Sequence, residues 1–481
     1  MAESRYFRED CYINGEWIGG RKRIDVNNPA TGEIIGSVPN LGRSETAAAI
    51  DAAHAAFLLW REKPAIERGE LCRKYYQALM DNQKELGRIL TIEMGKSLRE
   101  AMGEVAYAAN FFRWFGEEAR RVYGDVIPSP WGDKRILVTK EPVGVVGSIT
   151  PWNFPTAMIA RKAAAALAAG CTIVAKPASQ TPFSATAYGV IADEVGIPKG
   201  VINIITGSAA PIADEMCENP KVRKITFTGS TEIGKSLAAK AMLHMKRVSM
   251  ELGGNAPVIV FDDADLDRAV EGAMISKYRN SGQTCVCANR ILVQAGVYDR
   301  FAERFAQAAK NLKVGDGLDD ATEQGPLIDE SAVSKVERHI EDATSKGASV
   351  IAGGKRHAKG LSFFEPTVLR DVTPAMLIAR DETFGPVAPL FKFETEEEAI
   401  AMANDTEYGL ASYFFTRDLG RAFRVMEKLE YGMVAINEGV LSTEVAPFGG
   451  VKDSGMGREG SKYGVEDYIN TKYALVGGLG K

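Results

Sequence analysis

Residues 279–290 read R-N-S-G-Q-T-C-V-C-A-N-R and present a cysteine, Cys285, among uncharged polar residues. The pair Ser281-Gly282 just before it interrupts regular secondary structure. A cysteine that serves only packing more often lies in an apolar run, because thiols behave as small hydrophobic groups. The pattern therefore favours Cys285 as a nucleophile. The alternative is a packed thiol in a connection between a helix and a strand.

On both sides of this stretch the sequence alternates between strand-like and helix-like segments. The strand-like runs before it cover 143–150, 171–176, 201–205 and 224–228, and helical patterns start near Pro155, Phe183, Ala209 and Ser230. A second alternating region, 256–446, contains Cys285. Such alternation predicts parallel βαβ units and an α/β fold. Open sheets of this kind bind ligands at the carboxyl ends of their strands, so we expect the first region to be a cofactor domain.

The remaining segments predict a helical region and a ribbon. Residues 11–38 contain short strands with turns, and 44–121 show apolar residues at helical spacing. Residues 124–140 combine a Pro- and Trp-containing segment with the strand-like run R-I-L-V-T, which indicates a β-ribbon that leaves the body of the domain. Such ribbons often pair with another subunit.

The composition is that of an ordinary soluble globular protein. The 481 residues are enough for two or three domains with their own cores, so neither a structural metal nor a disulfide framework is required. The net charge of −5 predicts no nucleic-acid surface and no anionic-membrane surface. Six scattered cysteines and a charged N-terminus predict a reducing, cytoplasmic location. The longest apolar stretch, 157–175, contains Arg161 and Lys162 and indicates a core helix followed by a strand, not a membrane span.

Two motifs at predicted strand ends suit a dinucleotide. Thr228, Gly229 and Ser230 follow a strand and open a helix, where small residues let backbone N–H groups approach a pyrophosphate. A plain turn between strand and helix is the alternative. K-P-A-S at 176–179 ends another strand, and its lysine either neutralises a ribose phosphate or is a surface charge.

Two further motifs supply groups for catalysis. E-L-G-G-N at 251–255 places Glu251 at a strand end beside two glycines, a position that suits a general base. A surface acid is the alternative. P-W-N-F-P at 151–155 fixes the backbone around Asn153 with two prolines, and a fixed amide donor suits an oxyanion hole. A rigid loop without a catalytic role is the alternative there.

Together these motifs resemble the aldehyde dehydrogenase superfamily, and the resemblance covers nearly the whole chain. The motifs that carry it, in the family's order, are P-W-N-F-P at 151–155, K-P-A-S at 176–179, F-T-G-S at 227–230, E-L-G-G-N at 251–255, G-Q-T-C at 282–285, E-T-F-G-P at 382–386 and P-F-G-G-V-K at 447–452. The resemblance implies an aldehyde dehydrogenase-like α/β fold and a homo-oligomer, either a dimer or a tetramer. The parts expected from it are a Rossmann-type dinucleotide-binding domain over 1–123 and 145–255, a catalytic domain over 256–446, and a β-ribbon oligomerisation element over 124–144 and 465–481.

The resemblance implies four catalytic residues. The Cys285 thiolate would attack an aldehyde carbonyl, since the thiolate rather than the thiol is the nucleophile. Asn153 and the backbone N–H of Cys285 would hold the oxyanion, and Glu251 would activate the water that hydrolyses the resulting thioester. Lys162 matches a family lysine near the oxyanion site, with a place on the helix surface as the alternative.

The resemblance also implies the residues that bind the cofactor. They are Lys176 and Ser179 at the adenosine ribose, Gly229 and Ser230 at the pyrophosphate, Glu382 at the nicotinamide ribose with Phe384 beside it, and also Trp152 and Leu252. Members that prefer NAD commonly carry Glu where this chain has Ser179. A carboxylate there binds the free 2′-hydroxyl and repels a 2′-phosphate. Ser179 beside Lys176 therefore predicts NADP as the preferred cofactor, with NAD as a second.

Three stretches, at 277–290, 436–450 and 461–468, look most like succinate-semialdehyde dehydrogenases. In that group two arginines and a serine hold the distal carboxylate of the substrate, and Arg161, Arg279 and Ser442 fall at the matching places. Arginine suits this role because its planar fork binds a carboxylate bidentately. An intramolecular ion pair is the alternative for either arginine. Glu438 and Thr443 differ from other members, so succinic versus glutaric chain length stays open.

Three rival interpretations are also weighed. Oxidation would join Cys285 to Cys287 in a regulatory disulfide, although ring strain in so short a loop favours a packing thiol. A CoA-acylating aldehyde dehydrogenase would pass the thioester to CoA, which the retained Glu251 argues against. A non-catalytic protein on this fold should tolerate the loss of Cys285, Glu251 or Asn153, yet all three are present.

Overall fold

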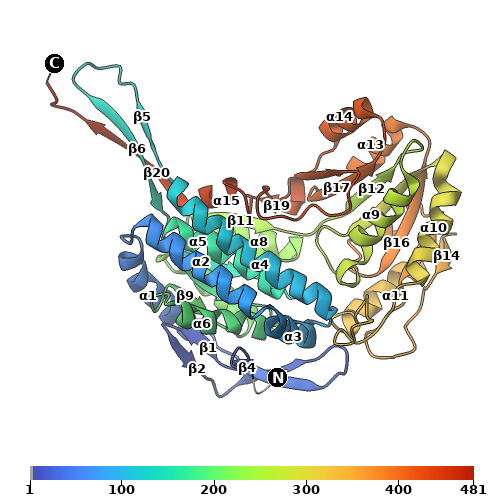
Figure 1. Cartoon of the computed structure of the whole chain (residues 1–481), viewed down its shortest axis with the longest axis horizontal. Coiled ribbons are helices and arrows are strands. Elements are labelled where there is room, and N and C mark those ends of the chain that lie inside the picture. The colour runs from blue at the N-terminus through green and yellow to red at the C-terminus, as the bar shows by residue number, and fades with distance from the viewer. Residues whose placement is uncertain (1–3, 481) are drawn as a thin grey trace.

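Figure 1 shows the computed structural model of the chain, which describes residues 4–480. One sheet has eight strands, and its central strands are parallel. In spatial order these are β11 (Arg247–Glu251), β10 (Val222–Thr228), β7 (Val145–Ile149), β8 (Thr172–Lys176) and β9 (Ile202–Ile204). The antiparallel strands β19 (Gly455–Met456), β1 (Cys11–Ile13) and β2 (Glu16–Ile18) complete its edges. The predicted α/β fold class is confirmed.

Helices surround this sheet and connect its strands. Those between the strands are α5 (Pro155–Ala169), α6 (Phe183–Val195), α7 (Ala209–Glu218) and α8 (Thr231–Met242), and those before them are α1 (Arg43–Trp60), α2 (Ala65–Asp81), α3 (Gln83–Met94) and α4 (Leu98–Glu118). Every residue of β7 and β8 is buried. Parallel strands covered by helices on both faces read as continuous apolar runs, which is why the sequence located these strands well.

Helix α5 is the most buried element of the first sheet's surroundings. It begins with Pro155 at a position where its missing N–H costs nothing, and it ends at Gly170 in the left-handed conformation (φ 95°). All of its residues are buried, including Arg161 and Lys162. The alternative that Lys162 lies on a helix surface is therefore wrong. Its many alanines let neighbouring helices approach closely, and α4 packs along it.

A second sheet contains seven strands. In spatial order they are β14 (Ser349–Ala352), β15 (Thr367–Arg370), β16 (Val387–Phe393), β13 (Ala288–Gln294), β12 (Ala256–Val260), β17 (Ala411–Phe415) and β18 (Met433–Ile436), all parallel except the β14–β15 pair. The accompanying helices are α9 (Leu266–Tyr278), α10 (Tyr298–Lys310), α11 (Glu330–Ser345), α12 (Leu377–Arg380), α13 (Glu396–Asn404) and α14 (Leu419–Lys428). Cys285 lies in the connection between α9 and β13.

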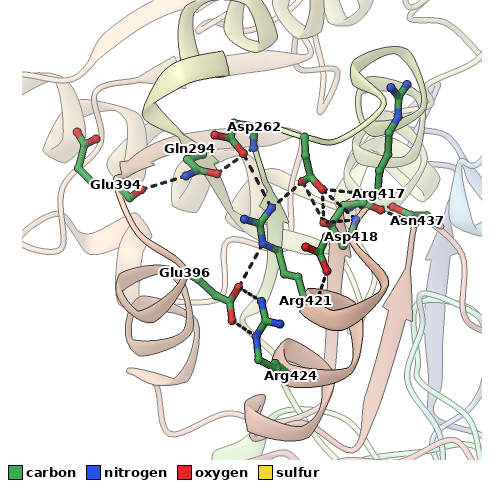
Figure 2. Close-up of polar contacts among 11 residues, drawn as sticks. Asp262, Gln294, Glu394, Glu396, Arg417, Asp418, Arg421, Arg424 and Asn437 are labelled. Carbon is green, nitrogen blue, oxygen red and sulfur yellow. Dashed lines mark hydrogen bonds and ion pairs between the residues drawn. The ribbon is translucent and has the colours of Figure 1, made fainter.

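At the carboxyl ends of the second sheet, charged and polar side chains form ion pairs and hydrogen bonds with one another. Figure 2 shows Arg421 on α14 between acidic groups, with Arg421 Nη1 2.7 Å from Asp263 Oδ1 and Nε 3.2 Å from Glu396 Oε2. Gln294, at the end of β13, accepts from the backbone N–H of Asp262 and donates to the Glu394 carbonyl. The predicted motifs of the first sheet instead follow its carboxyl ends, whereas Cys285 precedes the amino end of β13.

A ribbon extends from the body at the upper left of Figure 1. It consists of β5 (Asp125–Ile127), β6 (Arg135–Pro142) and β20 (Ile469–Val476), with β6 in the middle and antiparallel to both neighbours. Strands β5 and β6 lie within the range 124–144 that was predicted as a ribbon, and β20 lies within the range 465–481. Val126, Tyr473 and Leu475 on this ribbon are exposed apolar side chains.

Few elements remain. The strands β3 (Arg23–Asn27) and β4 (Ile34–Pro39) form a separate hairpin, and the short helix α15 (Tyr463–Glu466) precedes β20. Within residues 4–480 no helix combines the length and the apolar character needed to cross a bilayer.

Candidate active site

A cavity of about 380 Å³ brings together residues from both sheets. Its lining includes Trp152 and Asn153 after β7, Gly229 and Ser230 after β10, Leu252 after β11, Cys285 before β13, and Glu382 and Phe384 before β16. These residues are far apart in the sequence, and all of them were predicted site residues. Seven other predicted site residues lie outside this lining: Lys162, Lys176, Ser179, Glu251, Arg161, Arg279 and Ser442.

Cys285 is presented by a turn in an unusual conformation. Asn280 (φ 52°) and Ser281 (φ 57°) are both left-handed, and Gly282 follows with φ 74°. A Cβ at Gly282 would lie 2.2 Å from the carbonyl oxygen of Gly385, so the turn requires glycine there. Left-handed residues other than glycine cost free energy and persist where the surroundings hold them. Of the six cysteines, Cys285 alone is half-buried and the other five are buried, as expected for a nucleophile that a substrate must reach.

The surroundings of Cys285 hold it as a thiol. Burial raises the pKa of Cys285 to about 12, Arg161 opposes this effect, and the negative charges of Glu382 and Glu251 add to it. The thiolate is the reactive form. Ionisation of Cys285 therefore needs a nearby base or an added positive charge in the cavity.

The amide of Asn153 is held against the cysteine turn. Its Nδ2 donates to the carbonyl of Gln283 at 2.9 Å. The backbone oxygen of Asn153 accepts from Lys96 Nζ at 2.8 Å and from Asn280 Nδ2 at 3.0 Å. Asn153 is therefore fixed at both its backbone and its side chain, as an oxyanion donor must be.

Lys96 is itself fixed by a buried ion pair that the sequence did not reveal. Its ammonium lies 2.6 Å from Glu104 Oε2, and both side chains are almost completely buried. The other oxygen of Glu104 accepts from the backbone N–H groups of Thr156 and Ala157 at the start of α5. The pair thus ties α4 to the loop that carries Asn153. No local pattern marks Lys96 or Glu104 as buried, because a charged residue in a helical segment normally faces solvent.

Glu251 ends β11 in a cluster of buried charges. Neither oxygen of its carboxyl group has a hydrogen-bond partner among residues 4–480. Burial raises the pKa of Glu251 well above its ordinary value, and the charge of Glu459 raises it further. The alternative of a surface acid is therefore wrong. The raised pKa favours the protonated carboxyl group, and Glu251 must lose that proton before it can act as a base.

Glu459 is the centre of this cluster and was missed in the sequence. Arg161 Nη2 lies 2.6 Å from Glu459 Oε2, and Lys162 Nζ donates to Oε1. Burial alone would raise the pKa of Glu459, but Arg161 and Lys162 outweigh it and lower the pKa. Glu251 and Glu459 are thus neighbouring acids with pKa values moved apart, a pattern that marks acid–base sites.

A second cavity of about 280 Å³ adjoins the first. Phe154 borders both cavities. The second is also lined by Arg279, Ser442, Lys96, Glu100, Gly103, Glu104, Tyr107 and Asn280. It therefore unites two of the three predicted substrate residues. Arg161 is not in this lining, and its pairing with Glu459 realises the alternative of an intramolecular ion pair.

The cavity around Cys285 suits the pyrophosphate and nicotinamide ends of a dinucleotide. Ser230 is at the N-cap position of α8 without a side-chain capping bond, so the start of this helix meets the cavity beside Gly229. Glu382 Oε1 accepts from the backbone N–H of Gly254 at 3.1 Å, and burial raises the pKa of Glu382 to about 7. The ring of Phe384 meets that of Trp152 edge-on, 5.6 Å between centroids.

The two residues predicted at the adenosine ribose lie elsewhere. Lys176 ends β8, is buried, and donates to the carbonyl of Pro177 at 3.0 Å. Burial lowers its pKa to about 8, so the alternative of a surface charge is wrong. Ser179 follows in the next loop and is half-buried.

Comparison with known proteins gives the class. Residues 17–474 match the family described as Aldehyde dehydrogenase family. The chain belongs to this family, and the predicted enzyme class is confirmed.

Individual relatives are similar over their full lengths. A glutarate-semialdehyde dehydrogenase of Pseudomonas aeruginosa is 60% identical and covers 100% of both chains. An NADP-dependent succinate-semialdehyde dehydrogenase of Escherichia coli is 58% identical over 99% of both chains. The crystal structure of a succinate-semialdehyde dehydrogenase from Burkholderia pseudomallei superposes with a TM-score of 0.98 at 56% identity, over 99% of both chains.

Proposed function

We propose that this chain oxidises a short semialdehyde with a carboxylate at its far end to the dicarboxylic acid, using NADP in preference to NAD. One observation carries the proposal: the cavity of Cys285 adjoins a cavity that presents Arg279 and Ser442, and Phe154 borders both. The aldehyde end of the substrate reaches Cys285 while Arg279 holds the carboxylate bidentately. Succinate semialdehyde is the first candidate and glutarate semialdehyde the second, as in the two relatives named above.

The residues divide the reaction between them. The sulfur of Cys285 bonds to the aldehyde carbon, and Asn153 with the Cys285 backbone N–H holds the oxygen that becomes negative. When bound, the nicotinamide supplies the acceptor for the hydride, which leaves a thioester on Cys285. Glu251 then takes a proton from water, and the resulting hydroxide adds to the thioester carbon. The bond between this carbon and the sulfur of Cys285 breaks, which releases the carboxylic acid and the Cys285 thiolate. Lys162 and Glu459 form a buried ion pair beside Glu251 and fix the electrostatic environment of its carboxyl group.

The cofactor preference rests on Ser179. Its hydroxyl does not repel a 2′-phosphate, whereas a carboxylate would. Lys176 at the end of the neighbouring strand adds positive charge. The Escherichia coli relative carries NADP(+) in its name, which supports the same choice.

Assembly and location extend the proposal. The exposed ribbon 124–144 with 465–481 acts as the oligomerisation element of a dimer or tetramer, because its edge strands β5 and β20 leave unpaired backbone groups. Residues 1–123 with 145–255 bind the dinucleotide, and 256–446 carry the nucleophile. The enzyme works in the cytoplasm. Light scattering of the purified protein tests the assembly, and a monomer would contradict it.

One assay series tests the activity. Reduction of NADP and of NAD is followed with succinate semialdehyde, glutarate semialdehyde and butanal, with and without CoA. We expect kcat/KM to be at least about a hundredfold higher for one semialdehyde than for butanal, since a bidentate charged contact contributes about 3 kcal/mol. Equal values for butanal would contradict the proposal, and turnover only with CoA would assign the CoA-acylating class.

A further inference from the structure

Tyr107 on α4 carries a hydroxyl group that the fold leaves without a partner. Its Oη is buried and accepts or donates no hydrogen bond within residues 4–480. Its ring is held edge-on by Phe111, 4.9 Å between centroids. A buried polar group without a partner costs about 1–3 kcal/mol, so a ligand that satisfies it regains that free energy.

Tyr107 lines the cavity of Arg279 and Ser442. Burial raises the pKa of Tyr107, while the positive charges of Arg161 and Arg279 oppose the rise. The group therefore stays protonated at neutral pH and is a donor. These charges also show that Tyr107 lies within electrostatic reach of both arginines.

The other side-chain donors of this cavity, on Lys96 and Asn280, are already engaged. Lys96 donates to Glu104 and to the Asn153 backbone. Asn280 donates to the same Asn153 carbonyl, and its backbone N–H donates to Glu100. Within the described residues no ion pair or hydrogen bond occupies the side chains of Arg279 and Ser442, and the guanidinium of Arg279 lies over the ring of Phe154 at 4.9 Å. The available donors are therefore Tyr107, Arg279 and Ser442.

Two acids in the lining limit where an anion can bind. Glu104 is neutralised by Lys96. Glu100 is half-buried, and desolvation of its carboxyl group raises its pKa. An anion therefore finds its partners on the side of the cavity that Tyr107, Arg279 and Ser442 share.

We propose that Tyr107 determines specificity, because its hydroxyl donates to the distal carboxylate of the substrate beside Arg279 and Ser442. The inference rests on the proposed function and deepens it. A carboxylate offers about four acceptor sites on two oxygens. The fork of Arg279 fills two of them, which leaves sites for the hydroxyls of Tyr107 and Ser442.

Tyr107→Phe tests the inference, because it removes only the oxygen. Hydrogen bonds to charged groups contribute about 1.5–3 kcal/mol. We expect KM for the preferred semialdehyde to rise about ten- to a hundredfold with little change in kcat, and kcat/KM for butanal to stay within about twofold. Tyr463→Phe, an exposed tyrosine on α15, is the matched control and should change neither.

Stability separates this role from a structural one. Because the hydroxyl has no partner in the protein, Tyr107→Phe should unfold at the same temperature as the wild type or higher. Succinate, used as a dianion probe, should raise the unfolding temperature of the wild type more than that of the variant. A destabilised variant would overturn the inference, since the hydroxyl would then hold the fold together.

The failures of the two proposals are distinguishable. A wild type that does not prefer the semialdehyde over butanal overturns the proposed function and this inference with it. A wild type that does prefer it, with Tyr107→Phe keeping the full preference, overturns the role of Tyr107 alone. A loss of kcat/KM that is equal for both aldehydes also overturns it, because Tyr107 would then act on the shared chemistry.

Discussion

The ammonium group of Lys96 lies 2.8 Å from the backbone oxygen of Asn153, and it joins the oxyanion donor to a buried carboxylate on α4. Asn153 and Lys96 are 57 residues apart. The amide that we propose as the oxyanion donor is therefore positioned by an ion pair, Lys96 with Glu104, that lies behind it.

This relationship predicts that Lys96→Met lowers both stability and turnover. Removing Lys96 leaves Glu104 buried and unpaired, which costs about 3–5 kcal/mol. The double variant Lys96→Met with Glu104→Gln should regain much of that stability, because no charge is left buried. It should not regain kcat, because the backbone oxygen of Asn153 has still lost one of its two donors and keeps only Asn280. Urea denaturation and steady-state kinetics measure the two effects, and recovery of kcat in the double variant would contradict the positioning role.

Glu251 predicts a rise of activity with pH. Its pKa is raised by burial and by Glu459, and the group must lose its proton to act as a base, so turnover increases as the pH passes upward through the raised pKa. Glu251→Gln should lose this dependence and accumulate the acyl-enzyme, which mass spectrometry detects. Glu271→Gln, at an exposed position on α9, should keep the wild-type profile.

The same shift predicts a stability effect of opposite sign. A group whose pKa is higher in the folded than in the unfolded protein binds its proton more tightly when folded. Its contribution is complete below the unfolded pKa and is lost as the pH rises through the folded pKa. The stability of Glu251→Gln should therefore fall less than that of the wild type over this window. Denaturation curves at several pH values measure it, and parallel curves would contradict the raised pKa.

Glu459 is predicted to hold the buried cluster together. Glu459→Gln leaves Arg161 and Lys162 without their anion, so we expect a loss of about 3–5 kcal/mol. Glu67→Gln removes the exposed partner of Lys63 on α2 and should cost only about 0.3–0.5 kcal/mol. Equal losses in the two variants would mean that the cluster is not desolvated as its burial indicates.

Ser179 predicts a switch of cofactor. Ser179→Glu places a carboxylate against the 2′-phosphate of NADP, so kcat/KM with NADP should fall at least about tenfold while that with NAD holds or rises. Ser179→Ala removes the hydroxyl without adding charge and should leave the preference for NADP in place. Steady-state kinetics with both cofactors decides, and an unchanged ratio in Ser179→Glu would place the ribose elsewhere.

The sequence predicted the parts of the site that follow from local chemistry. Strands such as β7 and β8 are buried throughout and read as apolar runs, and Pro155 marked the start of α5. Cys285 was predicted as the nucleophile because the pair Ser281-Gly282 interrupts regular secondary structure just before it. These signals need no knowledge of what lies nearby in space.

Contacts between distant segments could not be predicted in this way. Lys162 and Glu459 are 297 residues apart, and each is a charged residue that would normally be expected at the surface. Arg161 was predicted as a substrate ligand, with an ion pair as the alternative. It pairs with Glu459, and no local pattern in the sequence points to that pairing. No sequence signal marks Tyr107 as a site residue either, because an aromatic residue in an apolar helix normally indicates core packing.

The position of Phe154 has a consequence for the length of the substrate. Phe154 lines both the cavity of Cys285 and the cavity of Arg279, and the cations of Lys96 and Arg279 lie over its ring. A molecule must pass this ring to place one end at each group, so the ring acts as a gauge. Compounds whose aldehyde and carboxylate groups are adjacent are too short to span both cavities. The number of methylene groups between the two functional groups therefore determines which compounds are substrates.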